Sequence, residues 1–167
     1  IGDMNHQNIL VKDGLVCFLD CDSYTIGGKI NEYTGSTYTD RYCPPEGRGK
    51  NVKQGQKADR FGLAVHIFQI LMNGTHPYTN KGIAVNEYNS IKEKINHTRF
   101  SFENPAVGQS EPPQWAPTYK LIQPNVRSLF WKCFVDGKKR AKRRPTAEKW
   151  ADELTDAKDY CVMNDDG

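Results

Sequence analysis

Residues 9–20 read Ile9-Leu10-Val11-Lys12-Asp13-Gly14-Leu15-Val16-Cys17-Phe18-Leu19-Asp20. Two short β-prone runs flank an Asp-Gly pair, which is a strong signal for a tight hairpin turn. We therefore predict a β-hairpin that folds about Asp13-Gly14. Folding there brings Asn8 and Asp20 together at the open end of the hairpin, where opposed residues lie roughly 5 Å apart.

The residues at this open end suggest a chemistry. An amide oxygen from Asn8 and a carboxylate from Asp20 are hard oxygen ligands of the kind that Mg²⁺ prefers, and Mg²⁺ keeps several of its sites for water and substrate phosphates. Asp3 lies on the loop just before the hairpin and is then free to orient an attacking hydroxyl. The pattern indicates a magnesium-dependent phosphate site.

At this point the chain resembles the C-terminal lobe of a protein kinase. Kinases carry H-R-D-L-x-x-x-N, D-F-G and A-P-E motifs. The corresponding segments here are Ile1-Gly2-Asp3-Met4 through Asn8, then Asp20-Cys21-Asp22, then Thr39-Asp40-Arg41-Tyr42-Cys43-Pro44-Pro45-Glu46. Further matches to the family are Asp59-Arg60-Phe61-Gly62-Leu63-Ala64, Gly74-Thr75-His76-Pro77-Tyr78 and Arg144-Pro145-Thr146-Ala147. Six matches in the family order cover nearly the whole chain.

The resemblance implies a mainly helical kinase lobe with a small β-hairpin at the catalytic loop. It implies a phosphotransferase that moves the γ-phosphoryl group of Mg²⁺-ATP to a protein hydroxyl, with Ser or Thr favoured. The implied catalytic residues are Asp3, Asn5, Asn8 and Thr39, the implied cofactor-binding residues are Leu10 and Asp20, the implied Mg²⁺ ligands are Asn8 and Asp20, and the implied structural residues are Glu46, Asp59 and Arg144.

Several of these roles have a plainer alternative. Leu10 would lie beneath the adenine ring, or it would be an ordinary core leucine of a strand. Thr39 would contact Asp3 from the substrate loop, or it would be a simple loop residue. Asp59 would accept hydrogen bonds from the backbone of the catalytic loop, would cap its helix, or would do both. Glu46 and Arg144 are expected to form a buried ion pair.

The chain also departs from the family pattern. Ile1 and Gly2 stand where the family has His and Arg, so a phosphate on the activation segment has no cationic partner in the catalytic loop. We therefore predict that switching by phosphorylation at Ser36, Thr37 or Thr39 is absent along that route. Asn5 replaces a lysine of many serine/threonine kinases, and Cys21-Asp22 replace Phe-Gly, which removes the conformational freedom of a glycine.

The expected organisation is a single domain over residues 1–167. Residues 1–22 hold the catalytic loop and hairpin, residues 20–46 the activation segment, and residues 59–167 a helical subdomain. Helices are predicted over 59–73, buried on most sides, over 86–96, and from Asn125 to a stop at Asp136-Gly137. A last helix would have Thr146 as its N-cap and bury Trp150, Leu154 and Ala157, and residues 103–124 form an irregular connection rich in proline.

Composition agrees with one globular domain, with 37% hydrophobic and 26% charged residues and a net charge of +3. Five cysteines without a C-x-x-C pair favour reduced thiols and a cytoplasmic location. The apolar run from Phe61 to Met72 is too short to cross a bilayer, which needs about 20 residues, so no membrane partner is expected. The basic run at 138–144 lacks interleaved aromatic residues, which disfavours nucleic acid as a partner.

The chain starts at the catalytic loop and contains no G-x-G-x-x-G motif. We expect the missing N-lobe, or another upstream segment, to be a partner alongside the protein substrate, and the isolated chain to be inactive. Without that half, the helix around 61–72 would lack a packing neighbour. Two alternatives stay open, a pseudokinase that only binds and a small-molecule kinase of the aminoglycoside or choline type. The latter lacks the platform at Thr39–Glu46 for polypeptide substrates.

Overall fold

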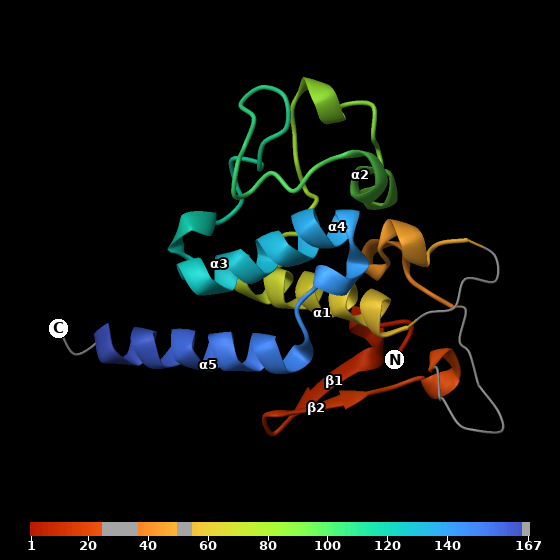
Figure 1. Ribbon diagram of the computed structural model, residues 1–167, viewed down its shortest axis with the longest axis vertical. Coiled ribbons are helices and arrows are strands. Elements are labelled where there is room, and N and C mark those ends of the chain that lie inside the picture. Colours follow the sequence, from red (N-terminus) through yellow and green to blue (C-terminus); the bar gives the residue numbers. More distant parts are fainter. Residues whose placement is uncertain (25–36, 50–54, 165–167) are drawn as a thin grey trace.

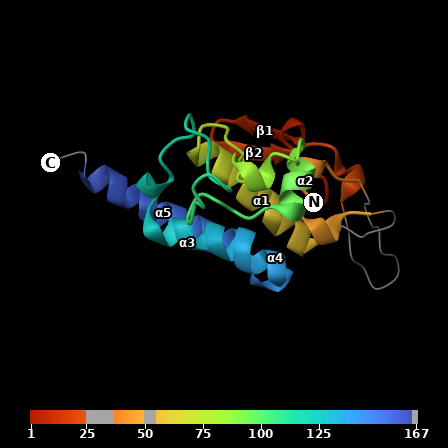
Figure 2. The same cartoon turned by 90° about the horizontal axis from the view of Figure 1, so that it is seen from above.

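The structure is a computed structural model that describes residues 1–24, 37–49 and 55–164, with side chains up to residue 159. It is mainly helical with one small antiparallel sheet, so the predicted fold class is confirmed. The strands are β1 (Ile9–Lys12) and β2 (Leu15–Phe18), and the α-helices are α1 (Gln56–Leu71), α2 (Ile91–His97), α3 (Pro124–Trp131), α4 (Gly137–Lys139) and α5 (Ala147–Asn164). Both views place α1 at the centre, with the hairpin on one side and α3–α4 on the other (Figures 1 and 2).

The hairpin forms as predicted. Its register pairs Ile9 with Phe18 and Lys12 with Leu15. Asp13 and Gly14 both adopt positive φ, 52° and 76°, which a two-residue type I′ turn requires. The strands lie on the surface, and their apolar side chains are largely exposed: Leu10 52%, Val11 71%, Leu15 74% and Val16 59%.

Helix α1 is the centre of the core. It begins three residues before the predicted start at Asp59, and it ends at Leu71. Phe61, Val65 and Phe68 are almost fully buried, and Phe68 meets several other rings of the core edge to face. The expectation that this helix lacks a packing neighbour was therefore wrong. Its exposed apolar surface is confined to its C-terminal end, where Ile70 is 80% exposed.

The helix that starts near Asn125 is longer than predicted. Asp136-Gly137 does not stop it, because a π-helical turn, Lys132–Asp136, joins α3 to α4. The helical path ends at Arg140, which has extended backbone angles. The packing at Gly137 leaves no room for a side chain, because an added Cβ would lie 2.6 Å from Cγ of Arg144.

The final helix follows the prediction closely. The hydroxyl of Thr146 accepts a hydrogen bond from the backbone N–H of Lys149 (3.3 Å), as an N-cap does. Trp150 is buried, while Leu154 and Ala157 pack on the core from the same face. Helix α5 contacts α3 along this face (Figure 2).

The remaining segments are shorter and less regular. Helix α2 begins at Ile91 rather than residue 86, because Ser90 and Glu93 form a reciprocal capping box at that point. Residues 103–123 contain only isolated bridges and the short 3₁₀ turn Tyr119–Leu121, in agreement with the predicted irregular connection. Of the predicted activation segment, residues 25–36, including Ser36, lie outside the described residues. Within the described part of the chain, no helix combines the length and apolar character needed to span a membrane.

Candidate active site

Asp3 is held at three points by neighbouring groups. Its backbone N–H donates to the hydroxyl of Ser23 (3.1 Å), and its backbone carbonyl accepts from the side-chain amide of Asn8 (3.2 Å). Its carboxylate oxygen Oδ2 accepts from the amide of Asn5 (2.8 Å). The other oxygen, Oδ1, is buried and has no hydrogen-bond partner. Buried polar atoms are usually satisfied, so one free acceptor on an otherwise fixed side chain points to a ligand.

Asn5 serves as the local brace of the loop. It is buried, and its Oδ1 accepts from the backbone N–H of Gln7 (2.8 Å), which caps the short 3₁₀ turn His6–Asn8. Its amide nitrogen at the same time holds Asp3. The sequence left the role of Asn5 open, and the structure places this amide against the carboxylate of Asp3.

Asn8 and Asp20 both lie at the open end of the hairpin, but their register differs from the prediction by one residue. The carbonyl of Asn8 accepts from the N–H of Leu19 (2.8 Å), so Leu19 lies opposite Asn8 and Asp20 follows it. The backbone pairing ends at Leu19, because Asp20 turns away from the strand direction with a φ of 55°. One carboxylate oxygen of Asp20 accepts from the N–H of Asp22 (3.3 Å), and the side chain is exposed.

Gly2 and Ser23 clasp the catalytic loop to the segment after Asp20. The hydroxyl of Ser23 donates to the carbonyl of Ile1 (3.2 Å) and accepts from the N–H of Asp3. Gly2 has a φ of 90°, and a Cβ built on it would lie 2.1 Å from the carbonyl oxygen of Ser23. Only glycine fits this approach. No motif marks Ser23 in the sequence, although a glycine at the place of the family's arginine is the kind of signal that indicates a close backbone contact.

Asp59 ties the same loop to α1. Its two carboxylate oxygens accept hydrogen bonds from the backbone nitrogens of Ile1 and Gly2, both at 2.9 Å. This is the contact that the resemblance implies. The alternative role as helix N-cap is wrong, because α1 begins at Gln56 with Gly55 as its cap residue.

Two predicted site residues, Thr39 and Leu10, have roles that the structure does not test. Thr39 makes no side-chain hydrogen bond among the described residues, so its role stays a prediction. Leu10 lies on β1 and is 52% exposed, which rules out the alternative that it is a core leucine. Its predicted contact with adenine stays a prediction.

The predicted pair between Arg144 and Glu46 is present, with 2.5 Å between Nη1 and Oε1. Its predicted burial is wrong for one partner: the side chain of Arg144 is 1% exposed, but that of Glu46 is 46% exposed. Arg144 also donates to the carbonyls of Lys57 (2.8 Å) and Gly137 (3.1 Å), and its Cζ lies 5.4 Å from the centre of the Phe61 ring. Arg144 is thus a buried side chain with several partners, and Glu46 is its half-exposed acidic partner.

A second arginine, Arg48, was missed from the sequence. Its guanidinium donates to the carbonyls of Asp40 (2.8 Å) and Cys43 (2.7 Å) and to two acceptors on α2, the carbonyl of Lys92 and the side chain of Asn96, both at 3.1 Å. Arg48 therefore fastens the end of the activation segment to α2. No short motif marks it, since its acceptors are mostly backbone carbonyls.

Histidines form a third set of unpredicted contacts between this segment and α1. The ring of Tyr42 stacks on His66, with 4.4 Å between centroids, and its hydroxyl lies 3.1 Å from Nδ1 of His6. His66 Nε2 lies 2.9 Å from the carbonyl of Met4, and burial lowers the pKa of His66. His76 Nε2 lies 2.9 Å from the carbonyl of Arg41, and deep burial lowers the pKa of His76 to about 3.

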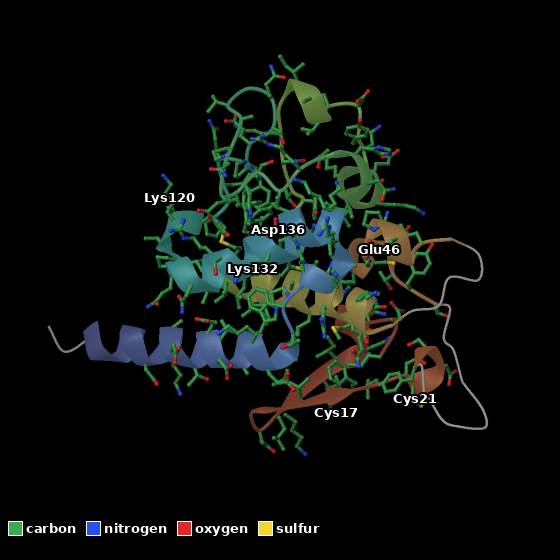
Figure 3. All side chains as sticks on the ribbon, viewed as in Figure 1. Cys17, Cys21, Glu46, Lys120, Lys132 and Asp136 are labelled. Carbon is green, nitrogen blue, oxygen red and sulfur yellow. The ribbon has the colours of Figure 1, made fainter. Side chains whose placement is uncertain are left out.

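In the part of the chain that the structure describes, no group of three His, Cys, Asp or Glu side chains could hold a metal ion. Cys17 and Cys21 are free and exposed on the hairpin side of the molecule (Figure 3), while Cys43 and Cys133 are buried.

Comparison with known proteins adds a relationship to this geometry. No family model matches the chain. It is 26% identical over 174 aligned positions to Protein kinase YegI of Escherichia coli strain K12, which covers 98% of this chain and 26% of that protein. It is 27% identical over 161 positions to Protein kinase YegI of Escherichia coli O157:H7, with 92% and 25% covered. The chain spans about a quarter of the length of these curated relatives. This weak homology supports the assignment of the chain to the protein kinase-like superfamily, as its motifs predict.

Proposed function

We propose that this chain is the catalytic lobe of an ATP-dependent protein kinase that phosphorylates a polypeptide hydroxyl. The observation that carries the proposal is the carboxylate of Asp3, with one oxygen fixed by Asn5 and the other buried and unpartnered. A hydroxyl group is the ligand that would satisfy this acceptor by donating a hydrogen bond. The named relatives support the kinase class, and the substrate belongs to the proposal.

In this mechanism Asp3 accepts the hydrogen bond of the substrate hydroxyl and orients its oxygen for attack. Asn5 fixes the rotation of the carboxylate, so that Oδ1 rather than Oδ2 faces the hydroxyl. Ser23 and Asn8 hold the backbone of Asp3 on both sides. Positioning is the main task of a phosphoryl-transfer enzyme, because the transferring group needs little covalent help.

The residues at the hairpin end fit a magnesium nucleotide. Because the amide nitrogen of Asn8 donates to Asp3, its oxygen is the atom left to bind a cation. Asp20 adds an exposed carboxylate. One carboxylate with one amide is too few ligands for an all-protein cage, but it suits Mg²⁺ that arrives with phosphate ligands. When bound, Mg²⁺ would neutralise charge on those phosphate oxygens, and the exposed Leu10 offers an apolar surface to adenine.

The clasp between Gly2 and Ser23 supports the predicted absence of one regulatory route. The loop position that would carry a phosphate-binding arginine is filled by a glycine, and the carbonyl of Ser23 occupies the place of its side chain. We propose that the catalytic loop is held by this contact rather than by a phosphate at Thr37 or Thr39.

Calorimetry of Mg²⁺-ATP binding to the intact protein that contains this chain tests the proposal. We expect binding that Asp20→Ala abolishes and that Asp159→Ala, an exposed aspartate on α5, leaves unchanged. A radiolabel assay with protein and small-molecule pools then identifies the acceptor class. Binding without transfer to any acceptor would show a pseudokinase, and labelling of small molecules alone would show a small-molecule kinase.

A further inference from the structure

A pocket of about 380 Å³ opens beside the catalytic loop. Its walls come from the catalytic loop, the end of the activation segment and the second half of α1. The lining residues are His6, Arg41, Tyr42, His66, Gln69, Ile70 and Gly74. We refer to it as the Tyr42 pocket.

The Tyr42 pocket is built onto the loop that carries Asp3. His66 contacts the carbonyl of Met4 (2.9 Å), and His6 contacts the hydroxyl of Tyr42 (3.1 Å). Met4 and His6 are the loop residues in these contacts, and they lie one and three positions after Asp3. Consecutive Cα atoms are about 3.8 Å apart, so three residues of a bound peptide span at most about 11 Å. The pocket is therefore within reach of side chains close to a hydroxyl held at Asp3.

The charge of the pocket is positive and uncompensated. None of its seven lining residues is acidic. Arg41 forms no ion pair in the described part of the chain, and its guanidinium lies 6.0 Å from the centre of the Tyr42 ring. The neighbouring Asp40 is paired with Lys92 (3.2 Å) and does not neutralise it. Burial lowers the pKa of His66, so Arg41 supplies the permanent charge near neutral pH.

We propose that the Tyr42 pocket receives an Asp or Glu side chain of the polypeptide substrate, within about three residues of the phosphorylated hydroxyl. Arg41 would bind this carboxylate, and guanidinium–carboxylate pairs are among the stronger hydrogen-bonded contacts in proteins. The hydroxyl of Tyr42 and the ring of His6 add polar contacts. This inference rests on the proposed function for its substrate and names the sequence preference of that substrate.

Peptide binding tests the inference separately from phosphate transfer. Fluorescence anisotropy would compare two labelled peptides that share one serine and carry Glu or Lys at the three positions on each side. The binding partner is the intact protein that contains this chain. We expect the Glu peptide to bind about tenfold to a hundredfold more tightly, as one charge-assisted contact allows.

Variants of Arg41 separate this pocket from general charge attraction. Arg41→Gln should remove the preference, and Arg41→Glu should turn it toward the Lys peptide. Arg140→Gln removes the same charge from an exposed site that does not line the pocket, and should leave the preference intact. Because the side chain of Arg41 makes no hydrogen bond in the described structure, these variants should unfold at the wild-type temperature.

An absence of preference in the wild-type protein, or a preference that survives Arg41→Gln, would overturn the inference. Transfer of phosphate without acidic preference would leave the proposed function standing while this pocket assignment fails. If the acidic peptide binds in a way that depends on Arg41 but no phosphate is transferred, the pocket assignment stands while the proposed function fails.

Discussion

Gly2→Ala is the sharpest perturbation of the catalytic loop, because it adds one methyl group where there is no room for it. The new Cβ would lie 2.1 Å from the carbonyl oxygen of Ser23, at a φ of 90°. The backbone strain alone costs roughly 1–2 kcal/mol. Moving Ser23 away also breaks its hydrogen bonds to Asp3 and Ile1, at about 1 kcal/mol each. We expect a total loss of about 3 kcal/mol in the free energy of unfolding.

Gly14→Ala is the matched control, because Gly14 also has positive φ (76°) but nothing lies within 4 Å of its added Cβ. It should cost only the strain. Urea denaturation of both variants measures the difference, which we expect to be about 2 kcal/mol. Phosphate transfer should fall about a hundredfold in Gly2→Ala alone, as a shift of Asp3 by about 1 Å would cause. Equal stability and equal activity of the two variants would show that the close contact between Gly2 and Ser23 does not hold the catalytic loop.

Three further changes test the supporting structure. Arg144→Met should lower the free energy of unfolding by about 2–5 kcal/mol, because two backbone carbonyls lose their donor. Glu46→Gln should lower it by at most about 1 kcal/mol, because Glu46 is half exposed. Equal losses in chemical denaturation would contradict the difference in burial between the two partners. Burial lowers the pKa of His76 to about 3 in the folded protein, whereas an unfolded histidine titrates near 6.5. The unfolded state therefore gains a proton as the pH falls, and the free energy of unfolding should drop by about 2 kcal/mol from pH 6.5 to 5. Urea titrations at the two pH values should show that His76→Gln removes this part of the pH dependence, and an unchanged pH dependence would count against it. Thr146→Ala should lower the free energy of unfolding by about 1 kcal/mol, whereas Thr146→Ser should keep the helix cap and the wild-type value. An unchanged free energy of unfolding in Thr146→Ala would show that the cap does not stabilise the protein.

The sequence predicted those parts of the fold that local chemistry determines. The turn at Asp13-Gly14 and the cap at Thr146 each depend on a few adjacent residues, and both are present. The continuation of α3 past Gly137 was not predictable in this way. Gly137 is packed against Arg144, seven residues further on, whose side chain fills the space beside the glycine and donates to its carbonyl.

The same division holds for the candidate site. Motif spacing located Asp3, Asn8 and Asp59. Asn8 contacts Asp3 within the catalytic loop, and Asp59 on α1 accepts a hydrogen bond from the backbone of the same loop. Ser23 was not singled out, and Tyr42 was matched only as part of a motif, without a contact. Their partners are backbone groups or rings on distant segments, which no residue spacing in the sequence reveals. Burial of Glu46 was overestimated because a motif names a partner but does not say how much solvent reaches it.

In the proposed mechanism, Asp3 orients the hydroxyl that receives phosphate. Single-turnover phosphate transfer by the intact protein, with Asp3→Asn compared to wild type at saturating Mg²⁺-ATP, tests it most directly. We expect the transfer rate to fall by a factor of about 10²–10⁴, with nucleotide affinity unchanged. A transfer rate in Asp3→Asn equal to that of the wild-type protein would contradict it.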